Sequence, residues 1–241
     1  MSRLGTTGAI AQAARFSDPL AGLEWLFKGI GLPVGAYQDY ALATPATADN
    51  DPFGGWQDEN GVSFGNSVST QRATLKNVSG SWAARFDGVD DCLVRTNISL
   101  PGDFTIFAKV NYGSAGGMVV GGNNAGPVNS QVLRFYNGYL AYYPNGGADT
   151  VISDSSVSGY NLGPVVIGII RSGSTIRFYD GETMIGETTS SYEFTAGCIG
   201  GLVISGGALA VPYSGDIYSV LIADSDMTAN VPQIVSALTA L

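Results

Sequence analysis

Three aspartates lie within five residues of one another in the segment ARFDGVDDCLV (84–94): Asp87, Asp90 and Asp91. They surround Gly88, a residue type that favours tight turns. Aspartates in such places commonly cap a turn by accepting hydrogen bonds from nearby backbone N–H groups. The alternative is a site for a hard cation, because Ca²⁺ takes several oxygen ligands at about 2.3–2.6 Å. We expect the capping role and keep calcium as the alternative; no other cofactor is expected.

A second group of residues has the types that recognise sugars. Sugar binding places an aromatic face against the pyranose ring and uses Asn or Asp to hydrogen-bond its hydroxyls. The stretch YLAYYPN (139–145) and the Asn123–Asn124 turn offer both ingredients. The candidate residues are Asn123, Asn124, Tyr139, Tyr142, Tyr143 and Asn145. The competing interpretation is that these tyrosines simply alternate between the core and the exposed face of a β-sheet.

Histidine is absent from the chain. Its absence excludes Ser-His and Cys-His nucleophile systems, His-ligated zinc and a histidine general base. The two cysteines, Cys92 and Cys198, each lie in a strand-like segment. Either a disulfide across the core or two buried free thiols fits this placement, and we favour the free thiols.

Composition and charge narrow the function further. The 241 residues are 45% hydrophobic and only 13% charged, which suits a chain that buries surface in an assembly. The formal net charge is −9 and the eleven Lys and Arg residues are scattered. Nucleic acid is therefore not expected as a partner, because phosphate binding needs a clustered basic face. The sequence contains neither an apolar run long enough to span a membrane nor the pattern of a secretory signal.

The elements that must position these residues are β-strands from Trp82 onward. Short segments rich in β-branched and aromatic residues recur about every ten residues, separated by Gly, Asn, Asp or Pro. The Asn137–Gly138 and Asp180–Gly181 pairs predict tight hairpins. Residues 226–241 predict an amphipathic helix with Val231, Ile234, Val235 and Leu238 on one stripe. The pattern favours an all-β antiparallel sandwich or barrel closed by a short helix.

The first third of the chain has a different pattern. From Asp18, the segment DPLAGLEWLFKGIG predicts a short helix with Asp18 at its N-cap and glycines at its end. Residues 33–80 show little regular pattern, so we expect a domain boundary near residue 78, between an arm (1–78) and a β domain (79–241). We predict that the arm fastens the protein to another subunit. Its anchoring residues would be Leu23, Trp25, Leu26, Phe27 and Ile30. The alternative is a helix packed on the domain's own core.

Residues 82–241 resemble the concanavalin A-like lectin/glucanase jelly roll, in its laminin-G-like branch. FDGVDDCLVR is similar to that family's opening strand pair, and LPGDFTIFAKV is similar to its next core strand. The ending YSGDIYSVLIADSDMT, followed by QIVSALTAL, is similar to its last strand, turn and short helix. The resemblance implies a two-sheet antiparallel jelly-roll sandwich. It does not imply one function, because this scaffold carries lectins, glycosidases and adhesion modules.

The resemblance also implies what a glycosidase of this fold would look like: a Glu-x-Asp-x-Glu pattern on one strand. Because side chains two positions apart lie on the same face of a strand, this pattern points an acid and a base into one groove. The chain lacks this pattern. Glu182 and Glu187 are five positions apart and would lie on opposite faces of a regular strand. Asp224 and Asp226 have the right parity but fall where the last strand is expected to end. We therefore expect no enzymatic activity and name no catalytic residue.

The unmatched arm, the low charge and the Gly/Ala/Ser/Thr-rich composition resemble virion proteins of tailed bacteriophages. That resemblance implies a structural protein of the head, tail or fibre, made in the host cytoplasm. Its partners would be other virion proteins or further copies of itself, and its lectin-like domain would bind a surface glycan. Two alternatives remain open: a free carbohydrate-binding lectin, and a glycoside hydrolase of the same fold.

Overall fold

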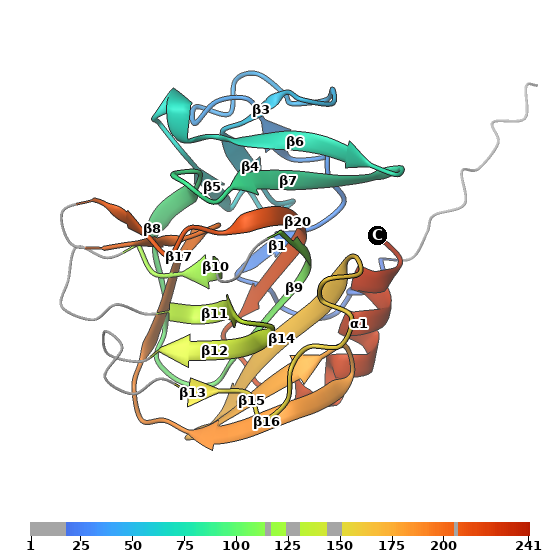
Figure 1. Ribbon diagram of the computed structural model, residues 1–241, viewed down its shortest axis with the longest axis vertical. Helices are drawn as coiled ribbons and strands as arrows, with labels where there is room; N and C mark the ends of the chain where they lie inside the picture. The colour runs from blue at the N-terminus through green and yellow to red at the C-terminus, as the bar shows by residue number, and fades with distance from the viewer. Residues whose placement is uncertain (1–17, 114–116, 124–130, 144–150, 205–206) are drawn as a thin grey trace, which may run out of the picture.

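Two antiparallel β-sheets packed face to face make up most of the molecule (Figure 1). The computed structural model describes residues 18–113, 117–123, 131–143, 151–204 and 207–241. The first sheet has the order β16 (Thr183–Thr189), β15 (Thr175–Asp180), β14 (Val165–Ser172), β9 (Phe104–Tyr112), β20 (Ser214–Ala223), β7 (Ser81–Asp87), β6 (Ala73–Val78) and β3 (Pro52–Phe53). A further strand, β1 (Phe27–Gly29), pairs with β20.

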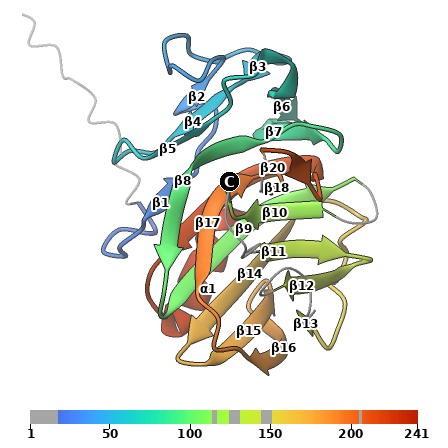
Figure 2. The same cartoon turned by 90° about the vertical axis from the view of Figure 1, so that its left-hand side faces the viewer.

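The second sheet covers the other side of the core (Figure 2). Its order is β13 (Val151–Ile152), β12 (Tyr139–Tyr143), β11 (Gln131–Tyr136), β10 (Gly117–Gly121), β17 (Phe194–Ile199), β8 (Leu93–Leu100), β5 (Ser63–Gly65), β4 (Gly55–Gln57) and β2 (Ala36–Tyr37). A small ribbon joins β18 (Leu202–Val203) to β19 (Leu209–Ala210). The expected two-sheet antiparallel jelly-roll sandwich is confirmed.

Both expected hairpins are present. Tyr136 pairs with Tyr139, so Asn137 and Gly138 form a two-residue loop, and both have positive φ as a type I′ turn requires. The second hairpin differs from the prediction by one position. Asp180 pairs with Thr183, so its loop is Gly181–Glu182, with positive φ at Gly181. That is the glycine-first arrangement of a type II′ turn.

The closing helix is also confirmed. Single turns of 3₁₀ helix span Ser69–Gln71 and Thr228–Asn230, and the second leads into α1 (Val231–Thr239). The stripe of Val231, Ile234, Val235 and Leu238 is buried against the outer face of the first sheet, over β9 and β14. This gives the molecule a second apolar cluster outside the sandwich, next to the main core between the sheets.

The helix predicted from Asp18 is wrong. Asp18 begins a turn, and Phe27–Gly29 is a strand that pairs with Val220–Ile222 of β20. On that side of β20, β7 covers only Ser214–Ile217. Without β1, the backbone groups on this side of Val220–Ile222 would be buried without hydrogen-bond partners. Leaving them unpaired costs more free energy than the helix propensity of the segment from Asp18 would contribute.

The expected boundary near residue 78 falls in the turn between β6 and β7, where Val78 pairs with Ser81. The preceding region, expected to be irregular, contributes β2, β4 and β5 to the second sheet and β3 and β6 to the first. These strands lie together at one end of the molecule (Figures 1 and 2). The described part of the predicted arm is therefore built into the same sandwich as residues 79–241.

Both cysteines, Cys92 and Cys198, are buried free thiols. Among the described residues, no helix has the length and apolar character that crossing a membrane requires.

Candidate functional site

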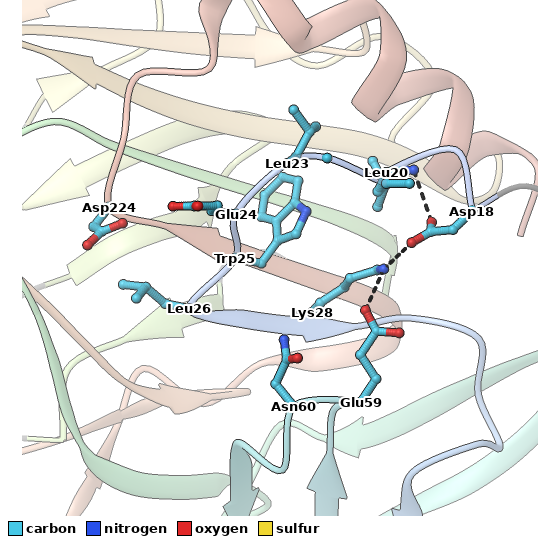
Figure 3. Close-up of a pocket in the computed structure, with 12 residues that line it drawn as sticks. Asp18, Leu20, Leu23, Glu24, Trp25, Leu26, Lys28, Glu59, Asn60 and Asp224 are labelled. Atoms are coloured by element: carbon cyan, nitrogen blue, oxygen red, sulfur yellow. Dashed lines mark hydrogen bonds and ion pairs between the residues drawn. The ribbon is translucent and has the colours of Figure 1, made fainter.

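A cavity of about 530 Å³ lies beside β1, and we call it the Trp25 pocket. Its walls come from three segments: the turn and extended chain from Asp18 to Lys28, the Glu59–Asn60 loop, and Asp224 just after β20 (Figure 3). Its volume is within the range of about 300–1,000 Å³ that small-molecule sites commonly have.

The first wall is held in place by contacts with the closing helix. Asp18 Oδ1 accepts a hydrogen bond from the N–H of Leu20 (3.0 Å), which sets the turn. The Leu20 side chain is buried in the apolar cluster under α1. Gln233 of α1 donates to the carbonyl of Pro19 (2.6 Å). The wall therefore depends on a helix more than two hundred residues away in the sequence.

The second wall is attached to β1 through Asp58, a buried aspartate. Its Oδ2 accepts the backbone N–H of Lys28 (3.1 Å). Its Oδ1 accepts the N–H groups of Asn60 (3.0 Å) and Val62 (2.8 Å). One carboxylate thus shapes the 58–62 loop and places Glu59 and Asn60 at the rim of the pocket.

A buried cation lies at one side of the pocket. Lys28 is 6% exposed, and its Nζ lies 2.5 Å from Asp18 Oδ2 and 2.8 Å from Glu59 Oε1 (Figure 3). Burial alone would lower the pKa of Lys28, but the hydrogen bonds to Asp18 and Glu59 outweigh it and raise the pKa. Burial would likewise raise the pKa of Asp18, yet its hydrogen bonds with Lys28 and Leu20 hold that pKa below its usual value. The three side chains therefore form one ion-paired cluster.

Trp25 lies between this cluster and two further carboxylates (Figure 3). Its side chain is half-buried and packs against the outer apolar cluster. The indole N–H is buried and has no hydrogen-bond partner among the described residues. An indole ring with an apolar face and one unsatisfied donor is the kind of group against which a sugar ring packs.

The polar groups at the rim are exposed. Glu24, Asp224 and Asn60 all line the pocket. No hydrogen bond or ion pair engages their side chains within the described ranges. Carboxylate and amide groups in this state are available to a ligand's hydroxyls or amines.

The predicted aspartate cluster forms at the β7–β8 turn. One ligand oxygen from each of Asp87, Asp90 and Asp91 lies within 4.8 Å of the others. The turn engages two of these carboxylates: Asp87 Oδ1 accepts the N–H of Val89 (2.8 Å), and Asp91 Oδ2 accepts the N–H of Asp87 (3.0 Å). These bonds are the capping role that the sequence predicts. The remaining oxygens would supply only part of a calcium shell of six to eight ligands.

Asp91 is the unusual member of this cluster. Burial raises its pKa to about 6, and the charges of Asp87 and Asp90 add to the effect, against the hydrogen bond from Asp87 N–H. Asp87 and Asp91 also line a second cavity of about 490 Å³. The same cavity is lined by an ion pair in which Arg85 Nε donates to Asp216 Oδ1 (2.7 Å) and Arg85 Nη2 donates to Asp216 Oδ2 (2.9 Å). A cation would relieve the repulsion between the three carboxylates, so calcium at this turn remains the alternative to the capping role.

The sequence-predicted sugar residues do not form one site in the described structure. Tyr142 is wrong as a binding residue, because it is fully buried and its hydroxyl bonds Ser190 (2.8 Å). Tyr139 is 38% exposed at the β11–β12 hairpin. The Asn123 amide donates to the carbonyl of Arg95 (2.8 Å). Asn124, Asn145 and the Tyr143 side chain lie outside the described residues.

The predicted anchoring residues are divided between this chain's own cores. Phe27 is fully buried between the sheets, 4.8 Å from the Phe64 ring centre and 5.8 Å from that of Trp56. Leu26 packs on the same core, whereas Leu23, Trp25 and Ile30 pack on the outer cluster. Docking on another subunit is untested, but Phe27 is not available for it. The pocket was not found from the sequence, because Trp25, Glu59 and Asp224 come from separate segments that no local pattern links.

No protein-family model and no curated protein matches the chain. Among solved structures it is similar to Trypanosoma rangeli sialidase in complex with 2,3-difluorosialic acid, at 10% identity and a TM-score of 0.52, over 79% of this chain and 31% of that one. It is also similar to a pentraxin from Limulus polyphemus, at 13% identity and a TM-score of 0.49, over 64% of this chain and 80% of that one. A third similar structure is the CBM40 of a Ruminococcus gnavus sialidase, at 12% identity and a TM-score of 0.47, over 64% of this chain and 95% of that one. At these identities the likeness concerns the fold alone.

Proposed function

We propose that this protein binds carbohydrate without modifying it, and that the Trp25 pocket is where the sugar lies. The observation that carries the proposal is the half-buried Trp25 at the centre of a cavity of about 530 Å³ whose rim carries unengaged carboxylate and amide groups. A sugar ring stacks on the indole while its hydroxyls bond Glu24, Asn60 and Asp224.

The test compares two aromatic variants for binding to an array of oligosaccharides. Trp25→Ala should weaken binding at least about tenfold, because a central aromatic contact commonly contributes more than 1.4 kcal/mol. Tyr139→Ala is the matched control, since Tyr139 is an exposed aromatic residue from the sequence-predicted site. Thermal unfolding of both variants checks that they remain folded.

Three outcomes contradict the proposal. Loss of binding in Tyr139→Ala but not in Trp25→Ala would move the site to the β11–β12 hairpin. A wild-type protein that binds no sugar would overturn the binding function. Release of reducing sugar from a bound oligosaccharide would favour the alternative, a glycoside hydrolase.

We further propose that the protein is a component of a tailed-bacteriophage particle, in the head, tail or fibre, made in the host cytoplasm and active as a homo-oligomer. The support is that the Gly/Ala/Ser/Thr-rich composition and the low charged fraction of 13% resemble those of tailed-bacteriophage virion proteins. The test is mass spectrometry of gradient-purified particles of the phage that encodes the chain, together with sedimentation of the purified protein. Absence from the particles, or a monomer that binds sugar, would favour a free lectin.

A further inference from the structure

The charges around the Trp25 pocket are strongly unequal. Four carboxylates line it, from Asp18, Glu24, Glu59 and Asp224, against one cation, Lys28. Lys28 is almost completely buried and already contacts Asp18 at 2.5 Å and Glu59 at 2.8 Å. Its ammonium group is therefore committed to the protein. A ligand that carries a carboxylate would find no uncommitted cation among the residues of this pocket.

Two of the carboxylates have no cation of their own. Glu24 belongs to the extended chain before β1, and Asp224 follows β20, so only the fold brings them together. Both side chains lie on one side of Trp25, opposite the Lys28 cluster in the view of Figure 3. Both are exposed, and no ion pair within the described residues involves them. The opening of the pocket therefore carries negative charge that a ligand can neutralise.

Trp25 favours the same kind of ligand. The face of an indole ring attracts a cation through its quadrupole, more strongly than the ring of tyrosine or phenylalanine. The indole is half-buried against the outer apolar cluster, which limits the access of water to one of its sides. An aromatic face next to uncompensated carboxylates is a common way in which proteins recognise an ammonium group. The net charge of −9 would also draw a cationic ligand toward the molecule.

We infer that the sugar bound in the Trp25 pocket carries a protonated amine: a saccharide with free amino groups, such as one built of glucosamine units. The inference rests on the proposed function and names its ligand class. The ammonium group lies within reach of Glu24 and Asp224, and the sugar ring packs on Trp25. Acidic saccharides, which carry a carboxylate, are repelled by the same groups.

The experiment uses three trisaccharides with the same β1,4-linked backbone that differ only at carbon 2, where they carry an ammonium group, an N-acetyl group or a hydroxyl. Sialyllactose and lactose form a second pair, which tests an added carboxylate. Affinities are measured by titration calorimetry with the full chain. We expect the amine form to bind at least about fivefold more tightly than the hydroxyl form, which is the gain that two exposed ion pairs would give. The preference should shrink when NaCl is raised from about 20 mM to about 500 mM.

Variants locate the effect. In Glu24→Gln/Asp224→Asn the ratio of the two affinities, amine form to hydroxyl form, should fall to within about twofold. Glu182→Gln is the matched control, because Glu182 is an exposed carboxylate in the β15–β16 loop that does not line the pocket, and this change should keep the ratio. A ratio that survives the double change would place the amine elsewhere and overturn the inference.

The outcomes separate this inference from the proposed function. Equal binding of the three trisaccharides, with loss in Trp25→Ala, leaves the sugar site in place and overturns the amine. Tighter binding of sialyllactose than of lactose overturns the inference in the same way. If wild-type protein binds none of these ligands and no sugar on the array, the proposed function fails and the inference fails with it.

Discussion

At the scale of single residues, one carboxyl group is kept in an environment that disfavours its charge. Asp91 is buried at the β7–β8 turn, next to Asp87 and Asp90, and its pKa is raised to about 6 from an ordinary value of 3.8. The protonated form is therefore favoured by folding. The stability that this contributes is fully present below pH 3.8 and is lost as the pH rises through about 6.

We predict that Asp91→Asn stabilises the protein above pH 6. The amide oxygen can still accept the hydrogen bond from the Asp87 N–H, while the cost of a buried charge disappears. The pKa difference corresponds to up to about 3 kcal/mol in the free energy of unfolding at pH 8, and to almost none at pH 4. Urea unfolding with EDTA at both pH values measures it.

The exposed Asp154 offers a control, since Asp154→Asn should leave stability nearly unchanged at both pH values. A less stable Asp91→Asn at pH 8 in EDTA would show that the charged carboxylate supports the turn. Repeating the measurement with added calcium tests the cation site as well. Calcium that stabilises the wild type but not Asp91→Asn would establish that Asp91 is a ligand.

At the scale of elements, the segment before Ile30 illustrates competition between a local pattern and a pairing edge. Its apolar residues recur at helical spacing, yet residues 27–29 form β1 and pair with β20. In an extended chain successive side chains point to opposite faces. Phe27 therefore enters the core between the sheets while Lys28 reaches the carboxylates of the Trp25 pocket.

We predict that Phe27→Ala lowers the free energy of unfolding by about 3–5 kcal/mol, the usual cost of removing a buried phenylalanine ring. The loss should appear in the isolated chain, because Phe27 packs on Phe64 and Trp56 of the same molecule. Val34→Ala is the control in the neighbouring loop, where Val34 is 77% exposed. Urea unfolding measures both. Unchanged stability of Phe27→Ala, together with loss of assembly, would restore the anchoring role expected from the sequence.

At the scale of the whole molecule, residues from both ends of the chain complete the sandwich and build the pocket. The strands between Ala36 and Val78 extend both sheets. On the side of β20 that β7 covers only in part, β1 pairs with the residues that follow. The Trp25 pocket draws on residues 18–28, 59–60 and 224, and α1 supports it through Leu20 and Pro19. A site of this kind depends on the fold being complete.

The sequence by itself determined most of the longer strands from Trp82 onward, the two hairpins to within one position, the closing helix and the jelly-roll class. These features depend on local information. Alternating β-branched residues, turn residues and an amphipathic stripe can each be recognised in a window of about ten to twenty residues. The aspartate turn belongs to the same group, since Asp87 and Asp91 bond backbone groups only two to four residues away.

Only the tertiary structure decided the fate of residues 18–78 and the location of the pocket. Strands of two or three residues, such as β1, β2 and β4, carry too little pattern to be recognised, and they form because a neighbouring strand offers unpaired backbone groups. Trp25 and Asp224 are about two hundred positions apart, and no local signal links them. Packing between distant segments, which gains its stability from buried apolar surface, brings them to one cavity.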